Sequence, residues 1–88
     1  MIKLASIEVR DGLTLRLTFT DGRGGVWDAA PMLCATDTPL TVPLRTPKAF
    51  ARAFIEGGAL AWPSGLEISP WTLYAELDSA GLLRKAAA

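Results

Sequence analysis

The sequence predicts an α+β fold, with an antiparallel sheet of about five strands built from hairpins and two or three short helices on one side. Apolar and polar residues alternate through much of the first twenty positions, which is the period of β-strands with one buried face. Gly57-Gly58 separates two further apolar segments and is typical of a hairpin turn. Ser69-Pro70 places a capping side chain before a proline at the first helical position.

Two apolar runs predict the first hairpin. They are Ala5, Ile7 and Val9 before the turn and Leu13, Leu15, Leu17 and Phe19 after it. A two-residue loop would set these apolar faces against polar ones, because directly opposed residues share a face of the sheet. A three-residue loop over residues 10–12 instead pairs Ile7 with Leu15 and gives Gly12 the left-handed conformation that such loops need. We therefore expect Ile7 and Leu15 to be opposed and both buried.

The stretch TDGRGGVWD is expected to form a turn and then a third strand near residues 24–28. Either Val26 or Trp27 can face the core, so the register of this strand stays open. A single helical turn with Pro31 near its start follows, and then an irregular, proline-rich connection. A short helix is expected to begin at Pro47, with Thr46 as its cap.

A second hairpin is expected around Gly57-Gly58. Its two-residue loop pairs Ile55 with Leu60, so both apolar side chains lie on the same face. The returning strand ends at Trp62, and the turn-forming run at residues 63–65 leads into a brief extended segment.

The last predicted helix follows Ser69. Leu73 and Leu77 are four residues apart, so they share the face that packs on the sheet. Gly81 is the expected stop, since glycine readily takes the left-handed conformation that commonly follows a helix. The sequence therefore predicts one domain over residues 1–81 and a C-terminal tail over residues 82–88.

The charges of the chain argue against nucleic-acid binding. Nine basic and nine acidic residues give a formal net charge of zero at pH 7, whereas phosphate binding depends on an excess of lysine and arginine. No apolar stretch reaches the roughly 18 residues of a membrane span. The N-terminal residues carry charges too closely spaced for a signal-peptide core. We expect a cytoplasmic protein that does not associate with membranes.

The residues do not predict a catalytic centre, a metal or a cofactor. The chain has no histidine and one cysteine, Cys34, so the commonest general base and the usual zinc ligand sets are missing. Asp28 is expected to cap or turn the chain, and Glu67 is expected to be solvated. The stretch DGRGG lacks the lysine and hydroxyl residue that complete a phosphate-binding loop. We expect no enzymatic activity.

Three tryptophans are many for a core of this size. Trp27, Trp62 and Trp71 exceed what one small core readily covers, so at least one is expected to be partly exposed. Together with Tyr74 they form the candidate interaction surface. A thin core that covers all three rings is the alternative.

Three stretches, RLTFTDGRGGVWD, PLRTPKAF and WPSGLEISPWTLY, resemble a bacterial family, domain of unknown function 2442. The likeness covers residues 2–77. The matching positions are Phe19, Asp21, Gly22, Asp28, Phe50, Trp62, Pro63, Gly65, Ile68, Pro70, Leu73 and Tyr74. Ser64 and Glu67 stand where the family pattern has asparagine and aspartate. The resemblance implies an α+β fold and no established activity.

The family resemblance also implies an interaction role, because some relatives look like the front half of helix-turn-helix proteins and others are encoded beside small toxin-like proteins. We therefore expect a non-catalytic protein-interaction module, antitoxin-like or regulatory, with a small toxin or regulatory protein as partner. Zero net charge and unpaired sheet edges further predict a homodimer.

Two alternatives from other functional classes stay open. The first is direct nucleic-acid binding through the sheet face that carries Arg10 and Arg16. The second is a small-molecule site in which Asp28 or Glu67 acts in a pocket beside Trp62.

Overall fold

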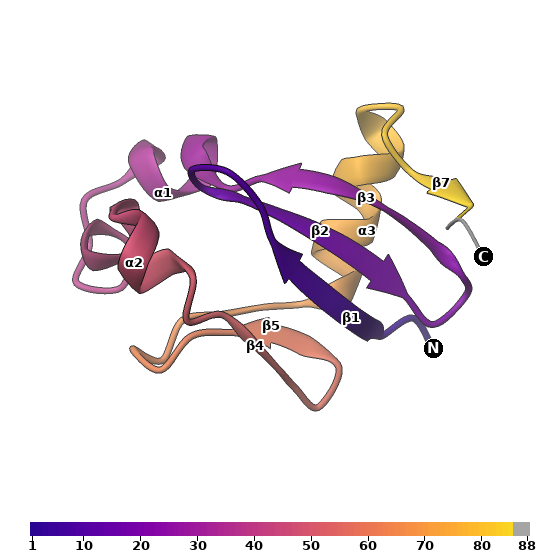
Figure 1. The fold of residues 1–88 in the computed structure, drawn as a ribbon, viewed down its shortest axis with the longest axis horizontal. Helices are drawn as coiled ribbons and strands as arrows, with labels where there is room; N and C mark the ends of the chain where they lie inside the picture. Colours follow the sequence, from indigo (N-terminus) through magenta and orange to yellow (C-terminus); the bar gives the residue numbers. More distant parts are fainter. Residues whose placement is uncertain (86–88) are drawn as a thin grey trace.

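Two antiparallel sheets and three α-helices form the fold in the computed structural model, which describes residues 1–85 (Figure 1). The predicted α+β class is confirmed. The strands divide between a four-stranded and a three-stranded sheet, where one sheet of about five strands was predicted. The second hairpin starts a sheet of its own because a long, mostly helical segment separates it from the first three strands.

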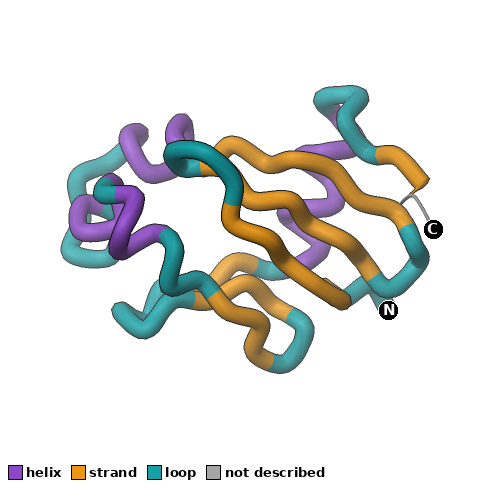
Figure 2. Tube along the Cα trace, in the orientation of Figure 1, coloured by secondary structure: helices purple, strands orange, loops and turns teal. Residues whose placement is uncertain are grey.

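The four-stranded sheet has the order β1-β2-β3-β7 and the three-stranded sheet the order β4-β5-β6. The strands are β1 (Leu4–Val9), β2 (Thr14–Phe19), β3 (Arg23–Asp28), β4 (Phe54–Glu56), β5 (Ala59–Ala61), β6 (Glu67–Ile68) and β7 (Arg84–Lys85). The helices are α1 (Ala30–Ala35), the 3-10 helix η1 (Val42–Arg45), α2 (Pro47–Phe50) and α3 (Pro70–Ser79). Figure 2 shows α3 crossing behind the larger sheet, whose other face carries no helix.

Strand β7 lies in the segment predicted as a C-terminal tail. Arg84 pairs with Gly24 of β3, and Lys85 pairs with Arg23, so this part of the tail extends the larger sheet. A strand of two residues is too short to show an alternating pattern, and the sequence therefore gave no sign of it. Residues 86–88 of the predicted tail lie outside the described residues.

The register predicted for the first hairpin is wrong by two residues. Ile7 lies opposite Leu17, and Val9 lies opposite Leu15. The Arg10 N–H donates to the Thr14 carbonyl at 3.0 Å, which closes the three-residue loop over residues 11–13 rather than 10–12. A shift of two residues keeps every side chain on its face, so the hydrophobic pattern could not distinguish the two registers.

Burial on the first strand also differs from the prediction. Leu15 is fully buried, but Ile7 is only half-buried because β1 lies at the edge of the sheet. An irregularity between Leu4 and Ser6 brings Leu4 opposite Phe19, so Leu4 becomes the buried residue of β1. Gly12 takes the left-handed conformation predicted for it, with φ +64°.

The open register of β3 is settled by Trp27. This residue lies opposite Leu15 and is buried, whereas Val26 faces away from the core. Gly25 lies on the core side opposite Leu17. A Cβ atom there would lie 2.6 Å from the carbonyl oxygen of Leu82, so only glycine lets the segment after α3 approach the strand this closely.

Helix α3 supplies the layer that covers the larger sheet. Leu73 and Leu77 are buried, as predicted. The Ser69 hydroxyl accepts a hydrogen bond from the Trp71 N–H at 3.2 Å, which confirms the predicted cap. Thr46 occupies the equivalent position before α2, but its hydroxyl donates to the Pro43 carbonyl at 3.3 Å, so the predicted side-chain cap is absent there.

The second hairpin forms with the predicted register. Ile55 lies opposite Leu60, and the two loop residues Gly57 and Gly58 have φ values of +59° and +86°, which glycine adopts without a steric penalty. The Leu4 N–H donates to the Gly58 carbonyl at 2.8 Å and so joins the two sheets.

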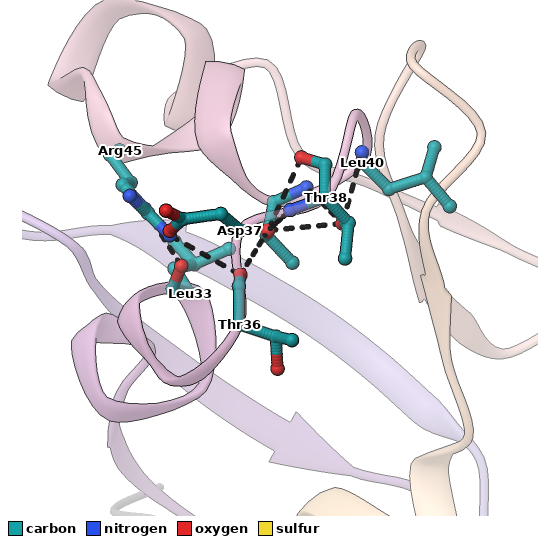
Figure 3. A network of polar contacts seen from close by, with 7 residues as sticks. Leu33, Thr36, Asp37, Thr38, Leu40 and Arg45 are labelled. Atoms are coloured by element: carbon teal, nitrogen blue, oxygen red, sulfur yellow. Dashed lines mark hydrogen bonds and ion pairs between the residues drawn. The ribbon is translucent and has the colours of Figure 1, made fainter.

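Side-chain hydrogen bonds fix the long connection between α1 and α2 (Figure 3). The Arg45 side chain donates from Nε to the Leu33 carbonyl at 2.8 Å and from Nη2 to the Asp37 carboxylate at 2.6 Å. The Thr41 hydroxyl donates to the Thr36 carbonyl at 2.7 Å. The Arg45 guanidinium therefore caps the C-terminal end of α1 and holds η1 against it.

Candidate functional site

The residues that match the family pattern gather in two clusters, and the first surrounds Trp62. This ring is buried against Phe50, with the ring centroids 5.6 Å apart. Trp62 Nε1 donates to the Phe50 carbonyl at 2.9 Å, so the one polar atom of the indole is satisfied in the core. The turn after it, Pro63 to Gly65, is closed by the Gly65 N–H donating to the Trp62 carbonyl at 3.0 Å. This part of the motif builds the core and reverses the chain.

The second cluster joins the turn after β2 to α3. The Tyr74 hydroxyl donates to Asp21 Oδ2 at 2.7 Å, and the ring of Phe19 meets the Tyr74 ring edge-on at a centroid distance of 5.1 Å. Gly22 follows in the left-handed conformation with φ +86°, and Asp21 Oδ1 accepts from the Arg23 N–H at 3.0 Å. These contacts hold the turn between β2 and β3 on the N-terminal half of α3, where Pro70 and Leu73 also lie.

The Tyr74–Asp21 hydrogen bond moves the pKa values of both groups further from neutral pH. The bond from Tyr74, followed by the bond from the Arg23 N–H, lowers the pKa of Asp21 below its usual range. The same bond to Asp21, with a contribution from desolvation, raises the pKa of Tyr74. Both shifts favour an ionised carboxylate and a neutral phenol, which is the pair that a structural hydrogen bond needs.

Asp28 acts at the start of α1. Its Oδ1 accepts from the Ala30 N–H at 3.0 Å, which forms an Asx turn just before the helix; of the predicted cap or turn role, this is the turn. Glu67 is exposed on β6. Trp62 is in the core, and Asp28 lines a surface hollow whose lining includes neither Trp62 nor Glu67. Asp28 therefore does not meet Trp62 in this hollow. Glu67 lies opposite Ala61, the residue before Trp62, and a small-molecule pocket there stays a prediction.

The three tryptophans have different environments. Trp27 and Trp62 are buried, and Trp27 Nε1 donates to the Glu76 carboxylate across the layer between β3 and α3. Trp71 is 56% exposed on the first turn of α3. Its ring meets Tyr74 edge-on at a centroid distance of 5.7 Å. Among the residues proposed as an interaction surface, Trp71 and the half-buried Tyr74 are the two that reach the solvent.

The helix-free face of the larger sheet carries balanced charges. Arg16 lies opposite Glu8 on the neighbouring strand, and the Arg10 guanidinium lies 3.2 Å from the same carboxylate. Arg45 is occupied in the connection after α1. The face predicted as the alternative nucleic-acid surface therefore offers basic groups that already have an acidic neighbour.

A hollow of about 200 Å³ lies beside β3, between α1 and the end of α3. It is lined by Val26, Trp27, Asp28, Pro31, Met32, Glu76, Leu77, Ala80 and Leu82. Val26 and Trp27 are neighbours on a strand and project to opposite faces of the sheet. Because both line the same hollow, the hollow lies along the edge of the strand rather than on one face.

Within residues 1–85, no three side chains of the histidine, cysteine, aspartate or glutamate type converge as a metal site would require. No helix in that part of the chain has the length and apolar character to cross a membrane.

No motif or local pattern of the sequence pointed to Glu76 or Leu82, which both line the hollow. Glu76 lies 49 residues from the tryptophan that it binds, and no local pattern marks such a pair. Leu82 falls in the predicted tail. The one local sign for Glu76 was its position directly before Leu77, at the border of the apolar stripe of the predicted helix.

Comparison with known proteins gives one match. No curated protein and no solved structure matches the chain. A family model described as a protein of unknown function (DUF2442) matches residues 4–79, a range that begins with β1 and ends with the last residue of α3. The resemblance found in the motifs is thereby confirmed, and the chain belongs to the DUF2442 family of proteins of unknown function.

Proposed function

We propose that this chain is a non-catalytic protein-interaction module whose contact surface is centred on Trp71. The single observation that carries the proposal is the exposure of Trp71, a residue 56% exposed on a helix whose other face packs its buried leucines on the sheet. Tryptophan is among the residues that contribute most to binding when a partner covers them. A large exposed ring also lowers solubility, and this cost is removed when a partner covers the ring.

The outer face of α3 extends this surface. Thr72 and Ala75 are exposed. Ala75 lies four residues after Trp71 and three after Thr72, so it neighbours both of them on the outer side of the helix. Small side chains beside a large ring allow another protein to approach the helix closely. The Trp71 surface, defined as Trp71, Thr72 and Ala75, is therefore suited to pack against an apolar partner.

The roles of the motif side chains support a non-catalytic function. Tyr74 and Asp21 bind each other, Asp28 closes an Asx turn before α1, and Trp62 lies in the core. Each polar group that the family pattern shares with this chain thus has a structural partner. The shared residues therefore stabilise the fold, and contacts with a partner fall to other residues on the surface.

The partner proposed here is a protein, either a second copy of the chain or the small toxin-like or regulatory protein that the family resemblance suggests. A specific interface buries at least about 1,000 Å² in total, which is more than one ring can supply. The neighbouring surface of α3 therefore has to take part. The zero net charge of the chain places no electrostatic barrier against a second copy.

Site-specific photo-crosslinking in the native host tests the proposal. A photoreactive phenylalanine analogue replaces Trp71 in one variant and Val42 in a control, since Val42 is 44% exposed on η1. We expect one discrete protein adduct from position 71 and none from position 42. The mass of the adduct tells a second copy from a different protein. Absence of any adduct at position 71, or the same adducts at both positions, would overturn the proposal.

A further inference from the structure

Half of the outer edge of β3 is uncovered. The Ala29 N–H donates to the Leu13 carbonyl at 2.9 Å, so by the alternation of an antiparallel ladder Gly25 and Trp27 direct their backbone groups toward β2. Val26 and Asp28 then direct theirs to the opposite side. β7 pairs with β3 only at Arg23 and Gly24, and no backbone hydrogen bond joins Val26 or Asp28 to the segment after α3 in residues 1–85.

The hollow described above lies along this uncovered edge. Val26 and Trp27 line it from the two faces of the strand, while Pro31 and Met32 of α1 and Leu82 close its other sides. A further strand in line with β7 would run through this space. The hollow would then hold an apolar side chain of that strand.

Two carboxylates make the hollow suited to a positively charged side chain. Asp28 and Glu76 line the hollow, and none of the residues that line it is basic. Each carboxylate uses one oxygen within the fold, Asp28 for the Ala30 N–H and Glu76 for the Trp27 indole. The remaining oxygens can accept hydrogen bonds from a cationic side chain.

The segment of the chain that pairs with the other half of this edge also combines apolar and basic residues. The segment that reaches the covered half of β3 reads Leu82, Leu83, Arg84 and Lys85, two apolar residues followed by two basic ones. A second copy that paired through the same edge would instead bring Asp28 and Glu76 toward their own equivalents, and like charges disfavour that arrangement.

We propose that the Val26–Asp28 edge of β3 binds an extended segment of a partner protein, which adds to β3 as a strand in line with β7 and carries alternating apolar and basic residues. Backbone hydrogen bonds to Val26 and Asp28 hold the segment, an apolar side chain enters the hollow, and a lysine or arginine meets Asp28 and Glu76. This edge site lies at the opposite end of α3 from Trp71, so it stands whether or not the Trp71 surface binds a partner.

A fluorescein-labelled heptapeptide of alternating lysine and valine is the probe, and its binding is followed by fluorescence anisotropy. The variant Val26→Pro removes the outward N–H without breaking the ladder to β2, because proline is tolerated at a strand edge. Val9→Pro is the matched control, since Val9 is 42% and Val26 39% exposed, and by the same alternation the Val9 N–H points away from β2 at the other sheet edge.

We expect wild type and Val9→Pro to bind the peptide equally and Val26→Pro to bind it at least tenfold more weakly. The double variant Asp28→Asn with Glu76→Gln keeps both internal hydrogen-bond acceptors, and it should weaken binding and reduce its salt dependence. A peptide with glutamate in place of lysine should not bind. Equal binding by the two proline variants, or no binding by wild type up to millimolar peptide, overturns the proposal.

Amide hydrogen exchange of the wild-type chain gives an independent readout if a proline variant fails to fold. Saturating peptide should slow exchange of the Val26 and Asp28 amides and leave the Val9 amide unchanged. Slowed exchange of Val26 and Asp28 without peptide, increasing with protein concentration, would assign the edge to a second copy and overturn the proposal. An adduct at position 71 in the crosslinking experiment is unaffected by either result.

Discussion

Trp62 and Trp71 flank the turn and short strand that lead into α3, and their surroundings are opposite. Trp62 is 2% exposed, packs on Phe50 and donates its indole N–H to a backbone carbonyl. Trp71 is 56% exposed and touches only the edge of Tyr74 among the aromatic rings of the described residues. One ring completes the core, and the other remains available at the surface.

The difference follows from where each residue falls in its element. Trp62 directly follows β5, whose Leu60 and Ala61 are buried, so the chain is already in the core when it reaches the ring. Trp71 lies two residues before Leu73, and on a helix that offset turns a side chain away from the buried stripe of Leu73 and Leu77. A dense aromatic motif therefore contains residues for folding and one residue for contact.

Replacing Trp62 should have the largest effect on stability. Trp62→Ala leaves a cavity beside Phe50 and removes the donor to its carbonyl, and we expect a loss of about 3–5 kcal/mol in the free energy of unfolding. Trp62→Phe fills most of the space and should lose clearly less. Urea denaturation followed by circular dichroism measures both. A loss below about 1 kcal/mol for Trp62→Ala would contradict the structural role of this ring.

Trp27 is intermediate between Trp62 and Trp71: its ring is buried, but its indole N–H donates to the exposed carboxylate of Glu76. Glu76→Ala leaves that donor without its partner, and we expect a loss of about 1 kcal/mol in the free energy of unfolding. Glu76→Gln retains an acceptor and should lose less than half of that. The same urea titration applies, and equal losses for the two variants would show that charge rather than the hydrogen bond matters.

Replacing Trp71 should affect association more than stability. Trp71→Ala loses the edge contact with Tyr74 but removes little buried area, so the free energy of unfolding should fall by at most about 1 kcal/mol. Light scattering at micromolar concentration should give a dimer mass for wild type and a monomer mass for Trp71→Ala. A variant that keeps the dimer mass would show that another surface joins the copies.

The Tyr74–Asp21 hydrogen bond should appear as a dependence of stability on pH. Because the pKa of Asp21 is lowered in the folded chain, its contribution is present above about pH 4 and is lost as the pH falls through the lowered pKa. The pKa of Tyr74 is raised, so its contribution is present below about pH 10 and is lost as the pH rises through the raised pKa.

Tyr74→Phe should flatten both ends of that profile. The alkaline dependence should disappear, and the acid dependence should become weaker but persist, since the Arg23 N–H still binds Asp21. Urea midpoints of wild type and variant between about pH 2 and pH 11 provide the measurement. Parallel profiles for the two proteins would contradict the assignment of the shifts to this hydrogen bond.

Local signals predicted much of the fold. The glycine pair at 57–58 fixes its hairpin register, and the Ser69 cap starts α3, because in both cases neighbouring residues supply the whole physical cause. The first hairpin shows the limit of such signals. Its loop begins one residue later than predicted, since a register shift of two leaves the apolar face unchanged.

Contacts between distant segments could not be predicted. Asp21 and Tyr74 are 53 residues apart and Trp27 and Glu76 are 49 apart, and the sequence gives no local reason for either pair. The exposure of Trp71 rather than Trp27 depends on which residue of β3 faces α3. The count of tryptophans predicted that at least one ring would be exposed, but the burial of Trp27 became known only from the register of β3.

Iodide quenching of tryptophan fluorescence tests the difference between Trp62 and Trp71 most directly. Dilute wild-type chain should show a quenchable fraction of its emission. Trp71→Phe should lose that fraction, and Trp62→Phe should keep it. Quenchable emission that persists in Trp71→Phe, or disappears in Trp62→Phe, would contradict the account.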